Sequence, residues 1–468
     1  MQFPTSDFLK FFAVFFIVYW ALPRHRWRMV WLLVASCVFY MSWNPWLILL
    51  ILFSASTDYL SALWMERTPS AGLKKGLLIG SISVNLGLLG FFKYANFFLD
   101  STSRILGYID VPLDRPTLDI ILPLGISFYT FETISYVVDV YSGRTKAVRD
   151  PLDYAIFIMF FPHLVAGPIV RPRDFLPQLR RTKRFDWDRA HLGVRMFLIG
   201  LFKKSVIADH LGTLVVDPVF ANPDSFASSA VWLGVLGYSI QIYGDFSGYS
   251  DMGIGLAHML GFKLPQNFNV PYLARNVAEF WRRWHISLSS WLRDYLFIPL
   301  GGSRFGAWKT YRNLLVVMLL GGLWHGANWT FVFWGLYHGL LLAFHRAIPW
   351  PRCFGYGLMR PVCVVATFLA VCIGWVLFRA ATVEQAGVIL ERMAWPAAGT
   401  RLANGPALLA IGCLALTLVG HTLGTRVDVI HSERRLPAAV MGGALAALLA
   451  LTLVLFPEGS RAFIYFQF

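Results

Sequence analysis

Two histidines lie in apolar stretches, where an ionisable side chain is costly. His325 stands in LLGGLWHGANWTFVFWGLYHG (319–339), and His285 stands in EFWRRWHISLSSWLRDYLFIPLGGSR (279–304). An imidazole titrates near neutral pH, so it can accept and return a proton during a reaction. Ionisable residues at membrane depth tend to be functional, whereas a core histidine bonded to a carbonyl is the structural alternative. Both histidines are therefore candidates for acid–base chemistry.

The element that carries His325 is predicted to be a broken helix. Basic residues flank the apolar run 313–345, so both of its ends are expected on the cytoplasmic side of a membrane. A helix from Asn313 to Trp324 would rise about 18 Å. The glycine-containing stretch 322–328 would then turn the chain near the middle of the membrane, because glycine tolerates a sharp break.

The stretch 279–304 is predicted to form one amphipathic helix at the cytoplasmic interface. At 100° per residue its tryptophans and leucines share a stripe that includes His285. Arg282, Arg283 and Arg293 point away from that stripe. Such a helix can lie in the interface while His285 faces a cavity.

The composition indicates a membrane-embedded protein. Hydrophobic residues make up 57% of the 468 residues and charged residues only 14%, against about 25% charged residues in soluble domains. Apolar runs near the roughly 20 residues of a membrane helix recur along the chain. We predict an all-α polytopic membrane protein with a single integral membrane domain over 1–468. The run 154–170 contains prolines and lies between two basic segments, so we predict that it is re-entrant or interfacial, entering and leaving on the cytoplasmic side.

The charge is also informative. The chain has 41 Lys and Arg against 26 Asp and Glu, which gives a net charge of +15. Most of this excess falls in short loops that we predict to be cytoplasmic, such as 23–28 and 171–189. The basic excess is therefore a topology signal, and nucleic acid is not an expected partner. The N-terminus is expected outside the cytoplasm, with the first apolar run retained as a helix.

Other polar groups leave alternatives open. Asp245 and Asp251 lie in the glycine-rich stretch 241–260 and could belong either to a cavity wall or to a structural polar network. His338 and His345 could share a helical face, but no HExxH pattern or carboxylate triad accompanies them. No metal site is therefore expected. Glu132 and Asp139 also lie within apolar sequence. Like Asp245 and Asp251, they could belong either to a cavity wall or to a structural polar network.

Taken together, several stretches resemble the membrane-bound O-acyltransferase family, and within it the branch of bacterial alginate O-acetyltransferase membrane subunits. The stretches that carry the resemblance are FFPHLVAGPIVR (160–171), YGDFSGYSDMGIG (243–255), EFWRRWHISLSSWLRDYLFIPLGG (279–302), LLGGLWHGANWTFVFWGLYHG (319–339) and FIYFQF (463–468). They span nearly the whole chain. The resemblance implies that His325 is the catalytic residue and that His285 is a second active-site residue.

The resemblance also implies a fold and a reaction. The expected fold is a ring of about 11–13 membrane helices, with broken and re-entrant segments, around a central tunnel. The expected reaction moves an acetyl group from a cytoplasmic thioester, acetyl-CoA above all, to a hydroxyl reached from the other side. No tightly bound cofactor is expected. Arg282, Arg283 and Arg293 would attract the phosphates of CoA, with membrane anchoring as the alternative role.

The implied setting is the bacterial inner membrane, crossed many times by the chain. The implied partners are periplasmic or membrane-anchored acetyltransferases and the machinery that makes an exopolysaccharide such as alginate. Three alternatives stay open from the sequence. They are a D-alanyl transferase or a lipid acyltransferase of the same family, and a polytopic transporter, since broken helices also mark transport pathways.

Overall fold

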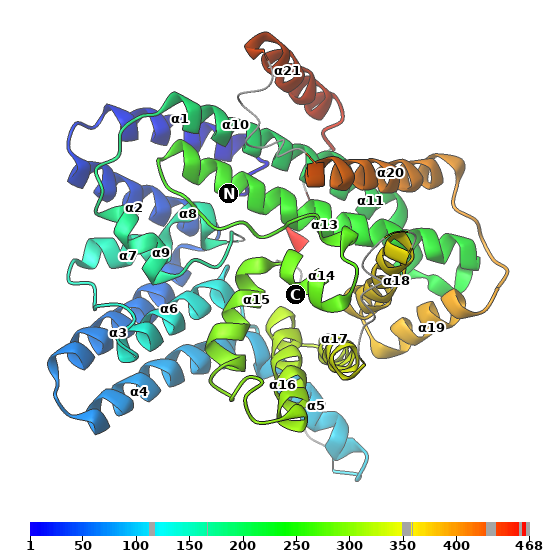
Figure 1. The fold of residues 1–468 in the computed structure, drawn as a ribbon, viewed down its shortest axis with the longest axis horizontal. Coiled ribbons are helices and arrows are strands. Elements are labelled where there is room, and N and C mark those ends of the chain that lie inside the picture. The colour runs from blue at the N-terminus through cyan, green and yellow to red at the C-terminus, as the bar shows by residue number, and fades with distance from the viewer. Residues whose placement is uncertain are drawn as a thin grey trace. The chain divides into compact units, whose positions relative to one another are not determined.

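The computed structural model describes residues 1–111, 118–165, 167–348, 357, 359–426, 437–457 and 461–464. These residues form helices joined by short loops, and across the described ranges the only β-type pairing is an isolated bridge between Phe226 and Thr400. The predicted all-α class is confirmed (Figure 1). The helix numbering reaches α21, beyond the predicted 11–13, because several predicted membrane helices are broken into shorter pieces.

Four helical stretches in the described ranges are long and apolar enough to cross a membrane. They are Pro45–Arg67, Ala71–Gly107, Met359–Arg379 and Asn404–Thr425. Each is at least as long as the roughly 20 residues that the hydrocarbon core requires. These stretches support a chain that passes the membrane several times.

Packing groups the chain into two compact units. Unit 1 comprises Met1–Ala190 and Leu256–Pro265, and unit 2 comprises His191–Gly255 and Gln266–Phe468. Two helices extend across the limits of the units, α10 (Trp187–Leu201) and α13 (Ser228–Met259). The single membrane domain over 1–468 stays a prediction.

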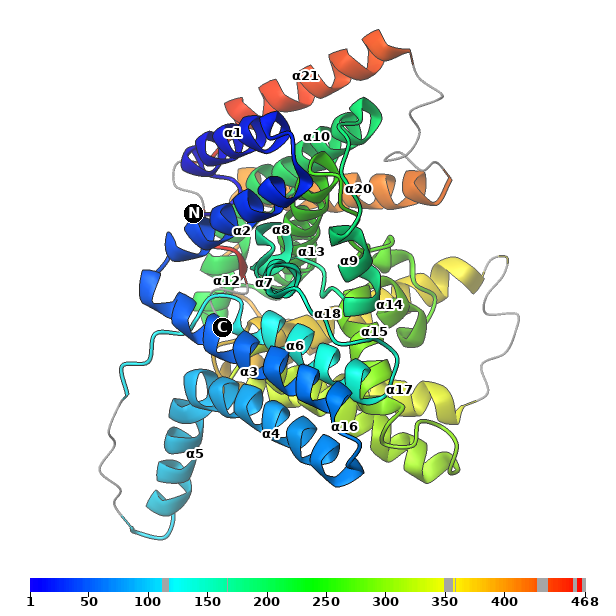
Figure 2. The same cartoon turned by 90° about the vertical axis from the view of Figure 1, so that its left-hand side faces the viewer.

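The described residues of unit 1 form nine further helices. They are α1 (Ser6–Ala21), α2 (His25–Met41), α3 (Ile48–Arg67), α4 (Ala71–Leu89), α5 (Ala95–Gly107), α6 (Ile126–Tyr141), α7 (Pro151–Met159), α8 (Phe161–Leu164) and α9 (Pro172–Leu179). Helices α3, α4 and α6 pack against one another, as Figure 2 shows. Buried polar groups join these three helices. The side chain of Asn85 donates to both oxygens of Asp58, at 2.8 and 3.0 Å, and accepts from Ser54 and Thr133.

The prediction of a broken segment at 154–170 agrees with the structure. Helices α7 and α8 meet at Phe160, and the described residues between α8 and α9 are not helical. Glu132 on α6 holds this segment, since its carboxylate accepts a hydrogen bond from the Val170 amide at 2.9 Å and lies 3.2 Å from Nδ1 of His163. Glu132 therefore belongs to a structural network. Asp139 also has a structural partner, because it lies 3.4 Å from the guanidinium of Arg144.

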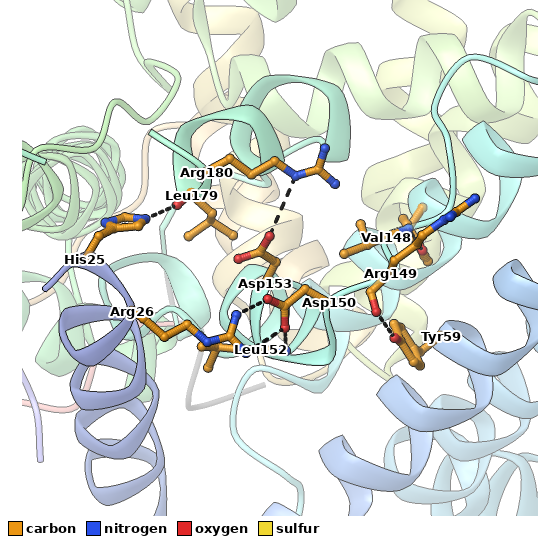
Figure 3. A network of polar contacts seen from close by, with 11 residues as sticks. His25, Arg26, Tyr59, Val148, Arg149, Asp150, Leu152, Asp153, Leu179 and Arg180 are labelled. Carbon is orange, nitrogen blue, oxygen red and sulfur yellow. Dashed lines mark hydrogen bonds and ion pairs between the residues drawn. The ribbon is translucent and has the colours of Figure 1, made fainter. Parts of the chain in front are cut away.

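An ion pair joins the residues on either side of the stretch that runs from α7 through α9 (Figure 3). Asp153 at the start of α7 pairs with Arg180 just after α9, at 3.7 Å. Nearby, Asp150 caps α7 by accepting from the Leu152 amide at 3.0 Å and pairs with Arg26. Burial alone would raise the pKa of Asp150, but its bond with Arg26 and the helix cap outweigh burial and lower the pKa. The start of α7 and the residue after α9 are therefore held close together.

Figure 3 also shows that the basic loops predicted to share one side of the membrane are in contact. His25, in the loop 23–28, donates to the carbonyl of Leu179 at 2.7 Å. The hydroxyl of Tyr59 donates to the carbonyl of Arg149 at 2.7 Å. The contact between His25 and Leu179 therefore joins the loops 23–28 and 171–189, as their shared charge indicates, whereas Tyr59 lies on α3. That these loops face the cytoplasm stays a prediction.

Unit 2 holds the remaining helices, several of them short. They are α11 (Asp209–Leu211), α12 (Asp217–Ala221), α14 (Val277–Arg283), α15 (Ile286–Leu292), α16 (Ala307–His325), α17 (Trp329–Ala347), α18 (Met359–Arg379), α19 (Val383–Ala394), α20 (Asn404–Arg426) and α21 (Ala438–Val454). Two π-helical segments matter below, η3 (Phe202–Ala208) and η7 (Arg293–Phe297).

Helices α16 and α17 form a tight hairpin. Glycines allow the close approach, because a Cβ atom on Gly322 would lie 2.2 Å from the carbonyl oxygen of Phe331 and one on Gly335 would lie 2.4 Å from that of Met318. The predicted break after Trp324 is confirmed. The first arm is longer than predicted, since α16 begins at Ala307 rather than at 313 and rises about 28 Å.

Candidate active site

The helix predicted over 279–304 does not exist as one piece. Helix α14 ends at Arg283 and α15 begins at Ile286, and between them His285 adopts a left-handed conformation with φ of +43°. The prediction failed because the 100° periodicity assumes an unbroken helix, and the break redirects the chain. His285 is nevertheless turned inward, with 0% of its surface exposed.

Asn267 stabilises this break from outside the helices. Its carbonyl accepts from the Ile286 amide at 2.9 Å, and its side-chain oxygen accepts from the Ser287 hydroxyl at 2.6 Å. Its amide nitrogen in turn donates to Ser250 on α13, at 3.2 Å. A buried asparagine that uses both ends of its amide can fix a non-helical backbone, since it supplies partners that the helix would otherwise provide.

His325 is the last residue of α16, where the helix gives way to the turn 326–328. Asn328 begins the next helix by accepting from the Thr330 amide at 3.1 Å. The imidazole of His325 packs against the rings of Trp334 and Phe378, each with a centroid 5.1 Å away. The hairpin therefore presents His325 at its tip among aromatic side chains.

The structure brings the two histidines together. The ring centroids of His285 and His325 are 6.5 Å apart, and the indole of Trp324 lies 6.0 Å from the first and 5.0 Å from the second. Phe246 on α13 covers His285, with ring centroids 4.6 Å apart. Among the described residues, neither ring nitrogen of His285 has a hydrogen-bond partner. Two neighbouring imidazoles could share or relay a proton, although their catalytic roles stay predictions.

An apolar cavity of about 220 Å³ opens beside His325. Its walls come from α14, α15, η7, α16 and α17 and consist mainly of leucine, valine, methionine and aromatic side chains. Trp281, Trp334 and Arg293 also line it. Pockets for whole drug-sized ligands measure about 300–1,000 Å³, so this cavity suits the end of a larger molecule.

The three predicted arginines differ in their surroundings. Arg293 is exposed, pairs with Asp294 at 2.7 Å and lines the cavity. Arg283 instead bonds to Glu279 at 2.7 Å, and Arg282 is exposed on α14 outside the cavity lining. Burial would raise the pKa of Glu279, but hydrogen bonds from arginines lower it overall. Arg293 is therefore the arginine best placed to meet a molecule that enters this cavity.

The stretch 241–260 carries a buried charge network. Lys204, on η3, lies 2.6 Å from Asp209 and 2.7 Å from Asp245. The second oxygen of Asp245 accepts from the Ile464 amide at 2.8 Å. These groups do not line the cavity beside His325, so the structural alternative for Asp245 agrees with the observed contacts. The sequence reasoning missed Lys204, although a lysine within the apolar run 190–211 was a visible signal.

The second aspartate of that stretch has a separate partner. Asp251 pairs with Lys203 at 2.7 Å, and both side chains are partly exposed. Lys203 also lies over the ring of Tyr243, 5.7 Å from its centroid. The adjacent lysines Lys203 and Lys204 on η3 thus form ion pairs with two different carboxylates of α13.

The C-terminal stretch that contributes to the resemblance is partly described. Arg461 forms an ion pair with Asp217, and the fully buried ring of Phe463 lies 4.5 Å from that of Tyr249. Residues 465–468 of the FIYFQF stretch lie outside the described residues. An ion pair and an aromatic contact thus hold the described residues 461–464 against the rest of unit 2.

No group of three or more His, Cys, Asp or Glu side chains in the described ranges is arranged to hold a metal ion. His338, considered above with His345, is fully buried among aromatic rings. The expectation of no metal site stays a prediction.

Comparison with known proteins identifies the family. The model of the membrane-bound O-acyltransferase family matches residues 146–349, which include both histidines and the cavity. A protein of Azotobacter vinelandii named "Probable alginate O-acetylase AlgI" is 46% identical over 395 residues, which cover 82% of this chain and 76% of that protein.

Two further relatives differ in their named acceptors. The peptidoglycan O-acetyltransferase of Helicobacter pylori is 39% identical over 425 residues, which cover 84% of this chain and 80% of the relative. The teichoic acid D-alanyltransferase of Bacillus subtilis is 29% identical over 299 residues, which cover 59% and 73%. These matches favour an enzyme over the transporter alternative. The chain therefore belongs to the membrane-bound O-acyltransferase family, and it is a multi-pass membrane O-acyltransferase.

Proposed function

We propose that this enzyme moves acetyl groups from acetyl-CoA, on the cytoplasmic side, to hydroxyl groups of a bacterial exopolysaccharide. The observation that carries the proposal is the buried pair His285 and His325, whose rings lie 6.5 Å apart and of which His325 lines a small apolar cavity. The cavity has room for the acetyl thioester end of a donor, while the bulky nucleotide would stay outside. The relatives named for O-acetylation match a larger share of the chain than the D-alanyltransferase does.

In the proposed reaction His325 acts as general base. It takes the proton of the accepting hydroxyl while the hydroxyl oxygen attacks the thioester carbonyl. The new C–O bond forms, the C–S bond breaks, and the thiolate of CoA recovers the proton. His285 orients the donor or shares that proton. The apolar walls exclude water, which would otherwise compete for the acetyl group.

The proposed setting is the bacterial inner membrane. There the enzyme would work with periplasmic or membrane-anchored acetyltransferases and with the machinery that makes the polymer. Alginate is the first acceptor to test, and peptidoglycan is the second because a relative that covers most of the chain is named for it. No tightly bound cofactor is part of the proposal.

The test uses the purified protein in lipid nanodiscs with acetyl-CoA labelled in the acetyl group. Label should appear in de-acetylated alginate, with partner proteins of the same organism added where transfer requires them. Label in peptidoglycan fragments alone would change the acceptor and keep the reaction. If D-alanine or a long acyl chain is transferred and acetyl is not, the proposed donor is wrong.

Replacing Arg293 by glutamine should raise the KM for acetyl-CoA about 5- to 10-fold, because a charge-assisted bond to a phosphate is lost. The KM for acetyl-pantetheine, which lacks the nucleotide, should not change. Arg282→Gln is the matched control, since this arginine is exposed but does not line the cavity. An equal effect on both thioesters would show that Arg293 does not contact the nucleotide.

A further inference from the structure

His338 on α17 is enclosed by aromatic rings and has no exposed surface. Its ring lies 5.2 Å from that of Trp281 and 5.0 Å from that of Trp334, both in edge-to-face arrangements. Neither of its ring nitrogens has a hydrogen-bond partner among the described residues. Burying an imidazole without hydrogen-bond partners costs free energy. A compensating role is therefore expected from the packing around His338.

Gly374 on α18 approaches the imidazole and limits the space beside it. A Cβ atom on this glycine would lie 2.6 Å from Nε2 of His338 and 3.3 Å from its Cε1. The ring therefore rests directly on the glycine backbone. A five-membered ring fits this space, whereas any added methyl group would force the imidazole to shift against the tryptophans around it.

Trp334 connects this packing to the candidate active site. Its indole touches His338 on one side and His325 on another, with centroid distances of 5.0 and 5.1 Å. It also lines the cavity beside His325. Since His325 stands at the end of its helix, ring contacts of this kind contribute to the orientation of its imidazole.

We propose that His338 is a positioning residue, which holds Trp334 against His325 and so fixes the imidazole of His325 for proton transfer. The inference rests on the proposed role of His325 as general base. It assigns no chemistry to His338 itself. Misplacement of a catalytic group by about 1 Å can cost about 100-fold in rate, so support behind such a group affects turnover more than binding.

Two substitutions disturb this support in opposite ways. His338→Ala removes it, and Gly374→Ala overfills it. Both should lower kcat for acetyl transfer about 10- to 100-fold and leave the KM for acetyl-CoA within about 2-fold. Gly412→Ala on α20 is the matched control, because a Cβ atom there meets nothing within 4 Å. The thermal unfolding of each variant in detergent shows whether it is folded.

A double-mutant cycle with Trp334→Phe tests the connection. If His338 acts through Trp334, the double variant His338→Ala/Trp334→Phe should be no slower than Trp334→Phe alone. If either single variant fails to fold, the pair His338→Ala/Gly374→Ala serves instead, since the new methyl group enters vacated space and should restore part of kcat.

Several results would overturn the inference. They are an unchanged kcat in folded single variants, additive losses in the cycle, or a higher KM with normal kcat. Activity as low as that of His325→Ala would instead assign His338 a direct part in the chemistry. Retention of transfer in His325→Ala is a separate outcome, which defeats the proposed function and not only this inference.

Discussion

Replacing His325 by alanine should lower acetyl transfer about 10²–10⁴-fold, the usual contribution of a positioned general base. The loss should appear in kcat, because the cavity that would receive the donor is formed mainly by other side chains. The fold should persist, since His325 ends its helix and alanine is a good helix former. Initial rates with labelled acetyl-CoA, together with thermal unfolding in detergent, measure both effects.

The matched control is His421→Ala. His421 is also a nearly buried histidine of unit 2, but its ring neighbours are Tyr243 and Tyr272 rather than the rings around His325. It should keep most of the transfer activity. If His421→Ala and His325→Ala lose activity equally, the loss reports damage to the bundle and not the removal of a base.

The second large effect concerns stability. Lys204→Met should destabilise the protein by about 3–5 kcal/mol, because it leaves two buried carboxylates, Asp209 and Asp245, without their shared cation. Unfolding by increasing amounts of SDS in mixed micelles measures the change. The neighbouring Lys203→Met provides the comparison, since its pair with Asp251 is partly exposed and water can replace the lost partner.

Lys203→Met should cost less than half as much stability as Lys204→Met. Equal losses would mean that burial does not distinguish the two pairs. A stable Lys204→Met protein would mean that the aspartates become protonated at little cost. The double variant Lys204→Met/Asp245→Asn then separates these cases, because it should recover part of the stability if an unpaired carboxylate is the cause.

The sequence was most informative where composition and flanking charge act locally. The break of the α16–α17 hairpin followed from glycines around 322–328 and from basic residues at both ends. The interrupted segment 154–170 followed from its prolines and the charges beside it. In both places the residues that interrupt the helix are close together along the chain, so the interruption can be predicted from the local sequence.

The sequence was least informative where the backbone conformation depends on a residue that is distant along the chain. Nothing in the periodicity of 279–304 reveals a left-handed His285, because the bonds that fix the turn come from Asn267, which is 20 residues before its partner Ser287. Lys204 stands out in its apolar run, but the sequence does not reveal that Asp209 and Asp245 are its partners. The pairing of His285 with His325 was anticipated only through family resemblance, since no local pattern joins two residues on different helices.

The bond between Asp245 and the Ile464 amide also bears on how the protein is made. The two residues are 219 positions apart, and a ribosome adds roughly 5–20 residues per second. Asp245 must therefore wait roughly 10 to 45 s for this donor after its own synthesis. During that interval the nascent chain holds a carboxylate oxygen without its final hydrogen-bond donor, so the packing around Asp245 is completed only when synthesis is nearly finished.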